Sequence, residues 1–143
     1  MKYFSVIVTI LLVSASLTGQ TDRDVEAVKA LLISQSEAWN RGDIDAFMEG
    51  YWKSDKLLFT SGGGITEGWQ NTLDRYKKGY PDRAAMGKLT FDILNVTKRS
   101  KKIISLNGKF TLEREKDRPT GYFLLLFQKI KGQWVIVADC TAG

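Results

Sequence analysis

The sequence has no histidine, one cysteine and two prolines among its 143 residues. Without histidine, Ser-His-Asp and Cys-His catalysis, histidine-ligated zinc and imidazole-based pH switching are excluded. The single cysteine, Cys140, excludes an internal disulfide and a multi-cysteine metal site. The chemistry that remains is that of carboxylates, tyrosines and lysines, or binding alone, so we expect no metal and no cofactor.

The rest of the composition is that of one folded domain. Hydrophobic residues make up 43% and charged residues 26%, which is neither a disordered nor a collagen-like composition. A chain of this length can bury one good core but not two. The net charge of +5 is modest and spread along the chain. Its basic run at residues 98–102 falls between two predicted strands and is typical of a solvated hairpin tip, so we expect no nucleic-acid partner.

Residues 1–20 have the pattern of a secretory signal peptide. Lys2 precedes an almost unbroken apolar run over residues 4–13, and small residues follow at 14–19. The run is about half the roughly 20 residues that a spanning helix needs, which favours a cleaved signal over an uncleaved membrane anchor. No cysteine follows the run, so we expect no lipid anchor. The sequence therefore predicts cleavage near residue 20 and a periplasmic or secreted domain over residues 21–143.

The first half of the predicted domain has the periodicity of helices. Apolar residues at three- and four-residue spacing predict a helix capped by Asp22 or Asp24 and ending near Asn40. Asp43 caps a short second predicted helix over residues 44–51. A third begins after Gly68 and stops before Pro81, and a short hairpin at 56–66 precedes it. The first two helices should fold back on each other.

From residue 89 onward the apolar period changes from helical to two. Strands are predicted at 89–93, 104–112, 122–130 and 133–141, with a bulge near Asn107-Gly108. The run from Phe123 to Phe127 leaves no polar face, so we expect that strand to be covered on both sides. Helices followed by long antiparallel strands predict an α+β domain with its helices on one face of the sheet.

Several segments resemble the NTF2-like superfamily (SnoaL-like, DUF4440 type). These are residues 38–43 (AWNRGD) with Phe47 and Tyr51, Gly68 at the third helix, and residues 132–139 (GQWVIVAD) near the end. The resemblance implies a cone, in which a strongly curved sheet wraps around a long helix and leaves a pocket at the open end. It also implies frequent homodimers through the outer face of the sheet. The superfamily includes isomerases, dehydratases, cyclases and association domains, so the fold does not fix the function.

A pocket in such a cone would be aromatic. Inward-pointing rings would form an apolar cavity suited to a flat or cyclic organic molecule, and the alternative is that they fill the cone as core. Glu113, a strand carboxylate, joins this set as a further candidate. The candidate pocket residues are Trp39, Tyr51, Trp52, Phe59, Trp69, Tyr76, Phe110, Glu113 and Phe127.

Asp139, with Tyr51 or Tyr76 as its partner, is the candidate catalytic or ligand-orienting group. By strand alternation Asp139 shares a face with Val135 and Val137, and a carboxyl group among apolar residues has its charged form disfavoured. A tyrosine hydroxyl should then lie near it. The neighbouring Cys140 is expected to be buried.

Three functions remain open. The first is an exported domain that binds a small organic molecule without chemistry. The second is a cofactor-free isomerase, dehydratase or cyclase that uses a pocket aspartate and tyrosine. The third is an interaction module that assembles through its sheet. We also expect a homodimer, because helices can cover only one face of the apolar run at residues 123–127.

Overall fold

A computed structural model of the chain describes residues 17–143. Most of the predicted signal peptide, residues 1–20, lies outside the described residues, and it stays a prediction that the intact mass of the protein from its native host would check. Among the described helices, none has the length and apolarity needed to cross a membrane.

In the part of the chain that the structure describes, four helices precede the long strands. They are α1 (Leu17–Asn40), α2 (Ile44–Met48), α3 (Trp69–Gly79) and α4 (Arg83–Met86). Asp43 caps α2 as predicted, accepting a hydrogen bond from the backbone of Ala46 at 2.9 Å. The single turn α4 was not predicted, because four residues are too few to show a helical period.

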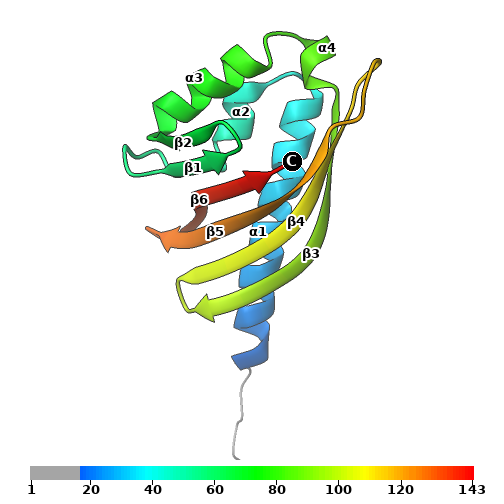
Figure 1. Ribbon diagram of the computed structural model, residues 1–143. Coiled ribbons are helices and arrows are strands. Elements are labelled where there is room, and N and C mark those ends of the chain that lie inside the picture. The colour runs from blue at the N-terminus through cyan, green and yellow to red at the C-terminus, as the bar shows by residue number, and fades with distance from the viewer. Residues whose placement is uncertain (1–16) are drawn as a thin grey trace, which may run out of the picture.

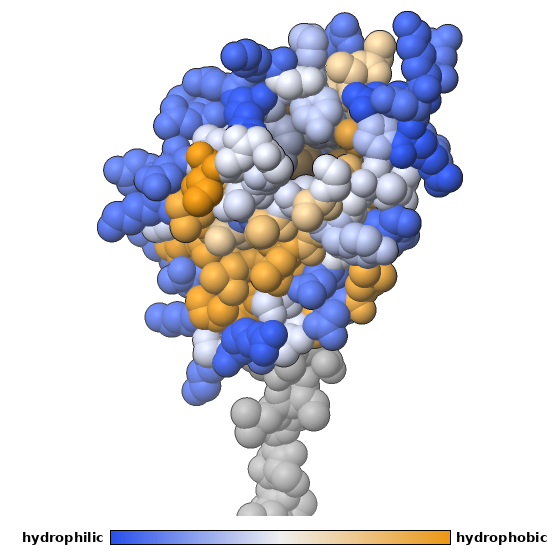
Figure 2. All heavy atoms as spheres, in the orientation of Figure 1, coloured by the Kyte–Doolittle hydropathy of each residue, from blue (hydrophilic) through white to orange (hydrophobic). Residues whose placement is uncertain are grey.

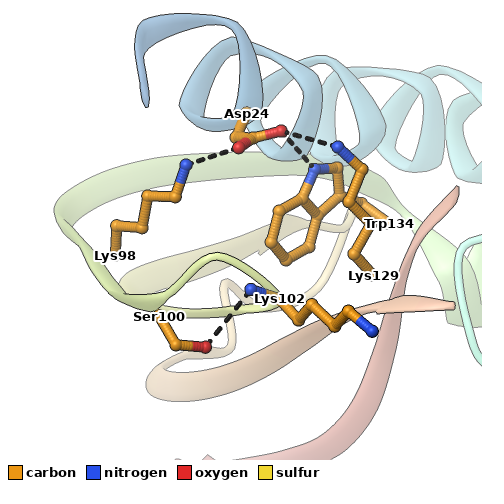
Figure 3. A network of polar contacts seen from close by, with 6 residues as sticks. All are labelled: Asp24, Lys98, Ser100, Lys102, Lys129 and Trp134. Atoms are coloured by element: carbon orange, nitrogen blue, oxygen red, sulfur yellow. Dashed lines mark hydrogen bonds and ion pairs between the residues drawn. The ribbon is translucent and has the colours of Figure 1, made fainter. Parts of the chain in front are cut away.

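The prediction that Asp22 or Asp24 caps the first helix is wrong, since α1 begins at Leu17. Asp24 is buried against the sheet, where Lys98, Lys129 and Trp134 all donate to its carboxylate (Figure 3). The sequence signal for a cap was local, whereas these partners come from three different strands far along the chain.

The strands form one curved sheet of six, in the order β2-β1-β6-β5-β4-β3. Every neighbouring pair is antiparallel except β1 and β6, which are parallel. The strands are β1 (Leu58–Ser61), β2 (Gly64–Glu67), β3 (Lys88–Ser100), β4 (Ile103–Glu113), β5 (Thr120–Ile130) and β6 (Gln133–Ala142). The predicted α+β class is confirmed, and the expected bulge falls on β3 at Leu94, opposite Asn107-Gly108 rather than on it.

The sheet curls around α1, which lies behind it in Figure 1. Val28 and Leu32 of α1 are fully buried against the concave face of the sheet, with Leu106, Phe127 and Ile136 among the core residues of the strands. At the other end of the sheet lie α2 and α3, beside the hairpin of β1 and β2 (Figure 1). The core runs from these residues to Trp39 at the end of α1 and Phe47 of α2.

Within residues 17–143, helices cover only the concave face, so the expectation that both faces of β5 are covered is wrong for a single chain. Along β5 buried and exposed residues alternate, and Tyr122 and Leu124 are 61% and 47% exposed. Cys140 pairs with Leu124 across the sheet and is exposed too, which corrects the prediction that it is buried. Figure 2 shows hydrophobic side chains gathered over this side of the sheet.

Candidate functional site

The wide end of the cone holds a cavity of about 620 Å³. Its walls come from the end of α1, from α2 and α3, and from the concave faces of the strands; in Figure 2 the surface is hollowed near the place where Figure 1 shows the C-terminus. The lining side chains are mainly aromatic and aliphatic, with three charged groups, Arg75, Arg114 and Asp139. This size and composition are those of a small-molecule pocket.

Aromatic rings form one continuous wall. Tyr76 of α3 lies at its centre, with ring centroids 5.2 Å from Phe47 and 5.5 Å from Phe59, in edge-to-face contacts. Trp39 and Tyr80 continue the wall at a separation of 4.7 Å. The indole of Trp39 donates to the backbone carbonyl of Met86 at 3.1 Å, which fixes the ring. Edge-to-face contacts of this kind hold the rings in place around the cavity.

A carboxylate lies at the inner end of the cavity. The hydroxyl of Tyr51 donates to Oδ2 of Asp139 at 2.7 Å, and the hydroxyl of Thr141 donates to Oδ1 at 2.7 Å. The hydroxyl of Tyr76 lies 3.5 Å from that of Tyr51, so the two tyrosines and the aspartate form a chain. Asp139 is only 5% exposed. The polar partner that the sequence predicted for it is Tyr51.

Burial sets the titration of this group. It raises the pKa of Asp139 from 3.8 to about 6, although the hydrogen bonds from Thr141 and Tyr51 act in the opposite direction. Burial also raises the pKa of Tyr51 and of Tyr76, and the negative charge of Asp139 adds to both shifts. The tyrosines therefore remain neutral donors, while Asp139 exchanges its proton near neutral pH, which suits a general acid or base.

An irregularity in β6 places Asp139 inside the cone. Ala138 pairs with Leu126, whereas Ile136 pairs with Phe127, so Val137 is an extra residue between them. The segment after α2 bonds to β6 at this point, because Ile136 exchanges backbone hydrogen bonds with Gly50 and Trp52 at 2.9 Å. Ile136 and Asp139 both face inward as a result. Strict alternation grouped Asp139 with Val135 and Val137, and that grouping is wrong.

The structure brings together six of the predicted site residues. The cavity wall includes Trp39, Tyr51, Phe59, Tyr76, Phe110 and Asp139. Asp139 accepts the two hydrogen bonds described above, and Phe110 lines the cavity from β4.

Four predicted pocket residues are not on the cavity wall. Phe127 is fully buried in the core below the cavity. Trp69 donates its indole to the carbonyl of Met48 at 2.9 Å and is covered by Lys53. Trp52 donates its backbone N–H to the carbonyl of Ile136 on β6 at 2.9 Å, but its side chain is not part of the cavity wall.

Glu113 is the fourth residue outside the cavity. It is exposed, and its carboxylate pairs with Arg118 at 3.3 Å. Its neighbour on β4, Leu112, points to the opposite face and lines the cavity. Among residues 17–143 no group of acidic or cysteine side chains has the arrangement of a metal site.

Sequence reasoning missed several polar residues of the cavity. Thr141 could have been found, because it is two residues beyond Asp139 on the same strand. Arg75 and Arg114 could not, because each belongs to a charged segment that looks exposed in the sequence, Arg75 within α3 and Arg114 just after β4. Tyr80 follows the last turn of α3, where no periodicity places it.

A curved sheet wrapped around one long helix, with an aromatic cavity and a buried acid at its open end, defines the class of the protein. No protein-family model matches the chain, and no curated protein matches it. Among solved structures it is 42% identical to an NTF-2 like protein of unknown function from Shewanella oneidensis MR-1, with a TM-score of 0.81 over 84% of this chain and 99% of that chain. The chain belongs to the NTF2-like family.

More distant structures share the fold. A ketosteroid isomerase-like protein from Erwinia carotovora atroseptica SCRI1043 is 18% identical, with a TM-score of 0.67 over 85% of this chain and 96% of that chain. A putative calcium/calmodulin-dependent protein kinase type II association domain from Thiobacillus denitrificans is 11% identical, with a TM-score of 0.69 over 80% of this chain and 92% of that chain. These likenesses show the architecture alone.

Proposed function

We propose that the protein binds a small, flat or cyclic organic molecule in the aromatic cavity. The observation that carries the proposal is the cavity itself, about 620 Å³ of space walled by fixed aromatic rings at the open end of the cone. A merely structural set of rings would have packed into that space. Residues 1–20 support export of the domain to the periplasm or outside the cell.

The test uses Thr141, whose side chain lies on the cavity wall. We expect the neutral fluorescent probe N-phenylnaphthylamine to bind the wild type, and Thr141→Phe to weaken that binding by about tenfold or more, because the added ring occupies the cavity. Thr141→Val, which loses the same hydroxyl without adding volume, is the control and should retain binding. Equal probe fluorescence with all three proteins would mean that the probe, and the proposed ligand, do not enter the cavity.

Proton-transfer catalysis is a second candidate function, favoured by the contact between Tyr51 and Asp139. In this reading Asp139 removes or returns a proton on the bound molecule, and Tyr76 donates a hydrogen bond to an oxygen of that molecule. The reaction is a cofactor-free isomerisation, dehydration or cyclisation. The structural likeness to a ketosteroid isomerase-like protein is compatible with it. It predicts that Asp139→Asn abolishes turnover.

Assembly through the outer face, the exposed convex side of the sheet around Leu58, Ile65, Tyr122 and Leu124, is the remaining proposal. These large apolar side chains are exposed, and a contiguous apolar surface of this kind is uncommon on a monomer. A second copy of the chain, presenting the same face, would cover it symmetrically.

We expect wild-type protein to have the mass of a dimer by light scattering at micromolar concentration, and Leu124→Lys to have the mass of a monomer. The charge would be buried in the interface without a partner, which costs several kcal/mol. Ile33→Lys, at an exposed apolar position on α1, is the matched control and should remain dimeric. A monomeric wild type, or a dimer that survives Leu124→Lys, would contradict assembly through this face.

A further inference from the structure

The three charged side chains of the cavity wall are unevenly arranged. Asp139 is at the inner end, held by two hydroxyl donors, whereas Arg75 comes from α3 and Arg114 from the residue just after β4. Because Arg75 and Arg114 place two guanidinium groups on the wall, the cavity has partners for an anionic group of a ligand.

Arg75 is held in place by neutral groups. Its Nη1 donates to Thr66 at 2.7 Å, its Nη2 donates to Ser61, and its guanidinium carbon lies 5.1 Å from the centre of the Phe59 ring. Among the described residues no carboxylate forms an ion pair with it, in contrast to Arg114, whose Nε pairs with Asp117 at 2.7 Å. A half-buried guanidinium, oriented and stacked but with no counter-charge, is ready to bind an anion.

The distance between Asp139 and Arg75 along the cavity matches the length of a small ring system. Phe59 pairs with Asp139 across β1 and β6, and Ser61, which holds Arg75, is two residues further along β1. Two residues of a strand span roughly 6–7 Å. Gly62 and Gly63, also on the wall, have no side chains to block the approach to Arg75. A ring system of modest size would thus reach from Asp139 to the guanidinium.

Arg114 approaches from the opposite wall. Its Nη1 donates to the carbonyl of Ala85 at 3.1 Å, which fixes it beside the cavity. The charges of Arg114 and Arg75 both lower the pKa of Tyr80, against the larger effect of burial, so the two cations act on the same ring. Because Arg114 is already paired with Asp117, it contributes less to binding an anion than Arg75 does.

We propose that the ligand is an organic acid, with an apolar ring among the aromatic residues and a carboxylate that accepts hydrogen bonds from Arg75. The opposite end of the ring then faces Asp139, Tyr51 and Tyr76. This inference rests on the proposed function, because it names the class of molecule that the same cavity takes. The inference adds Arg75 as the residue that selects the ligand by its charge and orients it in the cavity.

The test compares naphthylacetate with naphthylacetamide, two probes of the same shape that differ by one negative charge. By calorimetry at neutral pH we expect the wild type to bind the acid at least about tenfold more tightly than the amide. Arg75→Gln should reduce this preference to below about threefold and leave the affinity for the amide unchanged. Lys78→Gln removes the same charge from an exposed position on α3, away from the cavity wall, and should keep the preference.

The outcomes separate the two proposals. If the wild type binds acid and amide equally, the organic-acid inference is wrong while the cavity remains a binding site. If it binds neither of them, nor N-phenylnaphthylamine, both proposals are wrong. The comparison of acid and amide binding to the wild type tests the organic-acid inference even if Arg75→Gln does not fold. A preference that Arg75→Gln and Lys78→Gln reduce to the same extent would reflect overall charge and would overturn the role given to Arg75.

Discussion

Replacing Asp24 by asparagine is expected to lower the free energy of unfolding by about 3–5 kcal/mol. Asp24 is 4% exposed, and its carboxylate accepts hydrogen bonds from Lys98 at 2.5 Å and from Lys129 and Trp134 at 3.1 Å each (Figure 3). Asparagine would leave two partly buried ammonium groups without their counter-charge. Removing one side of a buried ion pair is among the most destabilising single changes.

The pH dependence of this contribution has a definite sign. The hydrogen bond from Lys98 is the largest influence on the pKa of Asp24, and together with Lys129 and Trp134 it holds that pKa far below 3.8 despite the opposing effect of burial. A carboxyl group with a lowered pKa stabilises the fold above its ordinary pKa and loses that contribution as the pH falls. The wild type should therefore lose its advantage over Asp24→Asn on acidification below about pH 4.

Urea denaturation followed by circular dichroism at neutral pH is the measurement. Fluorescence is less suitable, because Trp134 is one of the partners of Asp24. Glu26→Gln is the matched control: it removes a carboxylate from the same helix, but from an exposed pair with Lys29, and should change stability by less than about 1 kcal/mol. A loss of similar size in the two variants would contradict a special role for the buried acid.

Asp24 matters to the cavity although it is far from it along α1. Its partners lie on β3, β5 and β6, so it fixes the first part of α1 to three strands at the narrow end of the cone. Trp39, fifteen residues later on the same helix, lines the cavity at the wide end. A rigid helix anchored at one end positions the aromatic wall at the other.

The sequence was sufficient for the fold class, because the helical and two-residue periods are local properties. Phe110 of β4 was predicted to line the pocket and does so, and a tyrosine, Tyr51 or Tyr76, was predicted as the partner of Asp139 from chemistry alone; Tyr51 is the one that donates to it. On β5 the continuous apolar run hid the alternation of buried and exposed residues that the structure shows. The predictions that were wrong concern residues whose contacts join distant segments of the chain. Asp24 has partners that are 74, 105 and 110 residues away, and no local pattern contains them.

The cavity wall was harder to predict than the fold for a similar reason. Trp69 and Phe127 are aromatic and buried or half-buried, as pocket residues would be, but the packing of α3 and the depth of the sheet place them elsewhere. Arg75 shows the opposite case. A charged residue on an exposed-looking helix reaches the cavity because Ser61 and Thr66, on the neighbouring hairpin, orient its guanidinium. Long side chains of this kind are placed by tertiary contacts only.

Asp139→Asn is expected to stabilise the protein at alkaline pH, which is the opposite of the effect expected at Asp24. The pKa of Asp139 is about 6 in the folded protein against an ordinary value of 3.8, because burial disfavours the ionised form. The folded state then holds its proton more tightly than the unfolded chain does, so stability falls as the pH rises from about 4 to about 6 and stays low above that. A difference of about two pKa units corresponds to about 3 kcal/mol.

Asparagine removes this cost while keeping the shape of the side chain. The hydroxyls of Tyr51 and Thr141 can rotate so that one donates to the amide oxygen and the other accepts from the amide nitrogen. We therefore expect Asp139→Asn to raise the free energy of unfolding by about 1–3 kcal/mol at pH 8, and to remove most of the stabilisation that the wild type gains on going to about pH 5. Asp92→Asn, the same change at an exposed position on β3, is the control and should do neither.

Asp139 is a buried charged side chain of the cavity wall, and its ionised form destabilises the fold. A residue that lowers stability is usually kept for its function, and proton transfer is the function to test first. If Asp139 transfers protons, the wild type should exchange the acidic protons of beta-tetralone with deuterated solvent, a reaction that NMR follows directly. The exchange rate should rise with pH around the pKa of Asp139, and the Asp139→Asn variant should show no exchange although it is more stable than the wild type.

Increased stability of the variant with no exchange in either protein would leave Asp139 as a group that orients the ligand. A variant that is less stable than the wild type at pH 8 would show instead that the carboxylate is structural, and would contradict both roles.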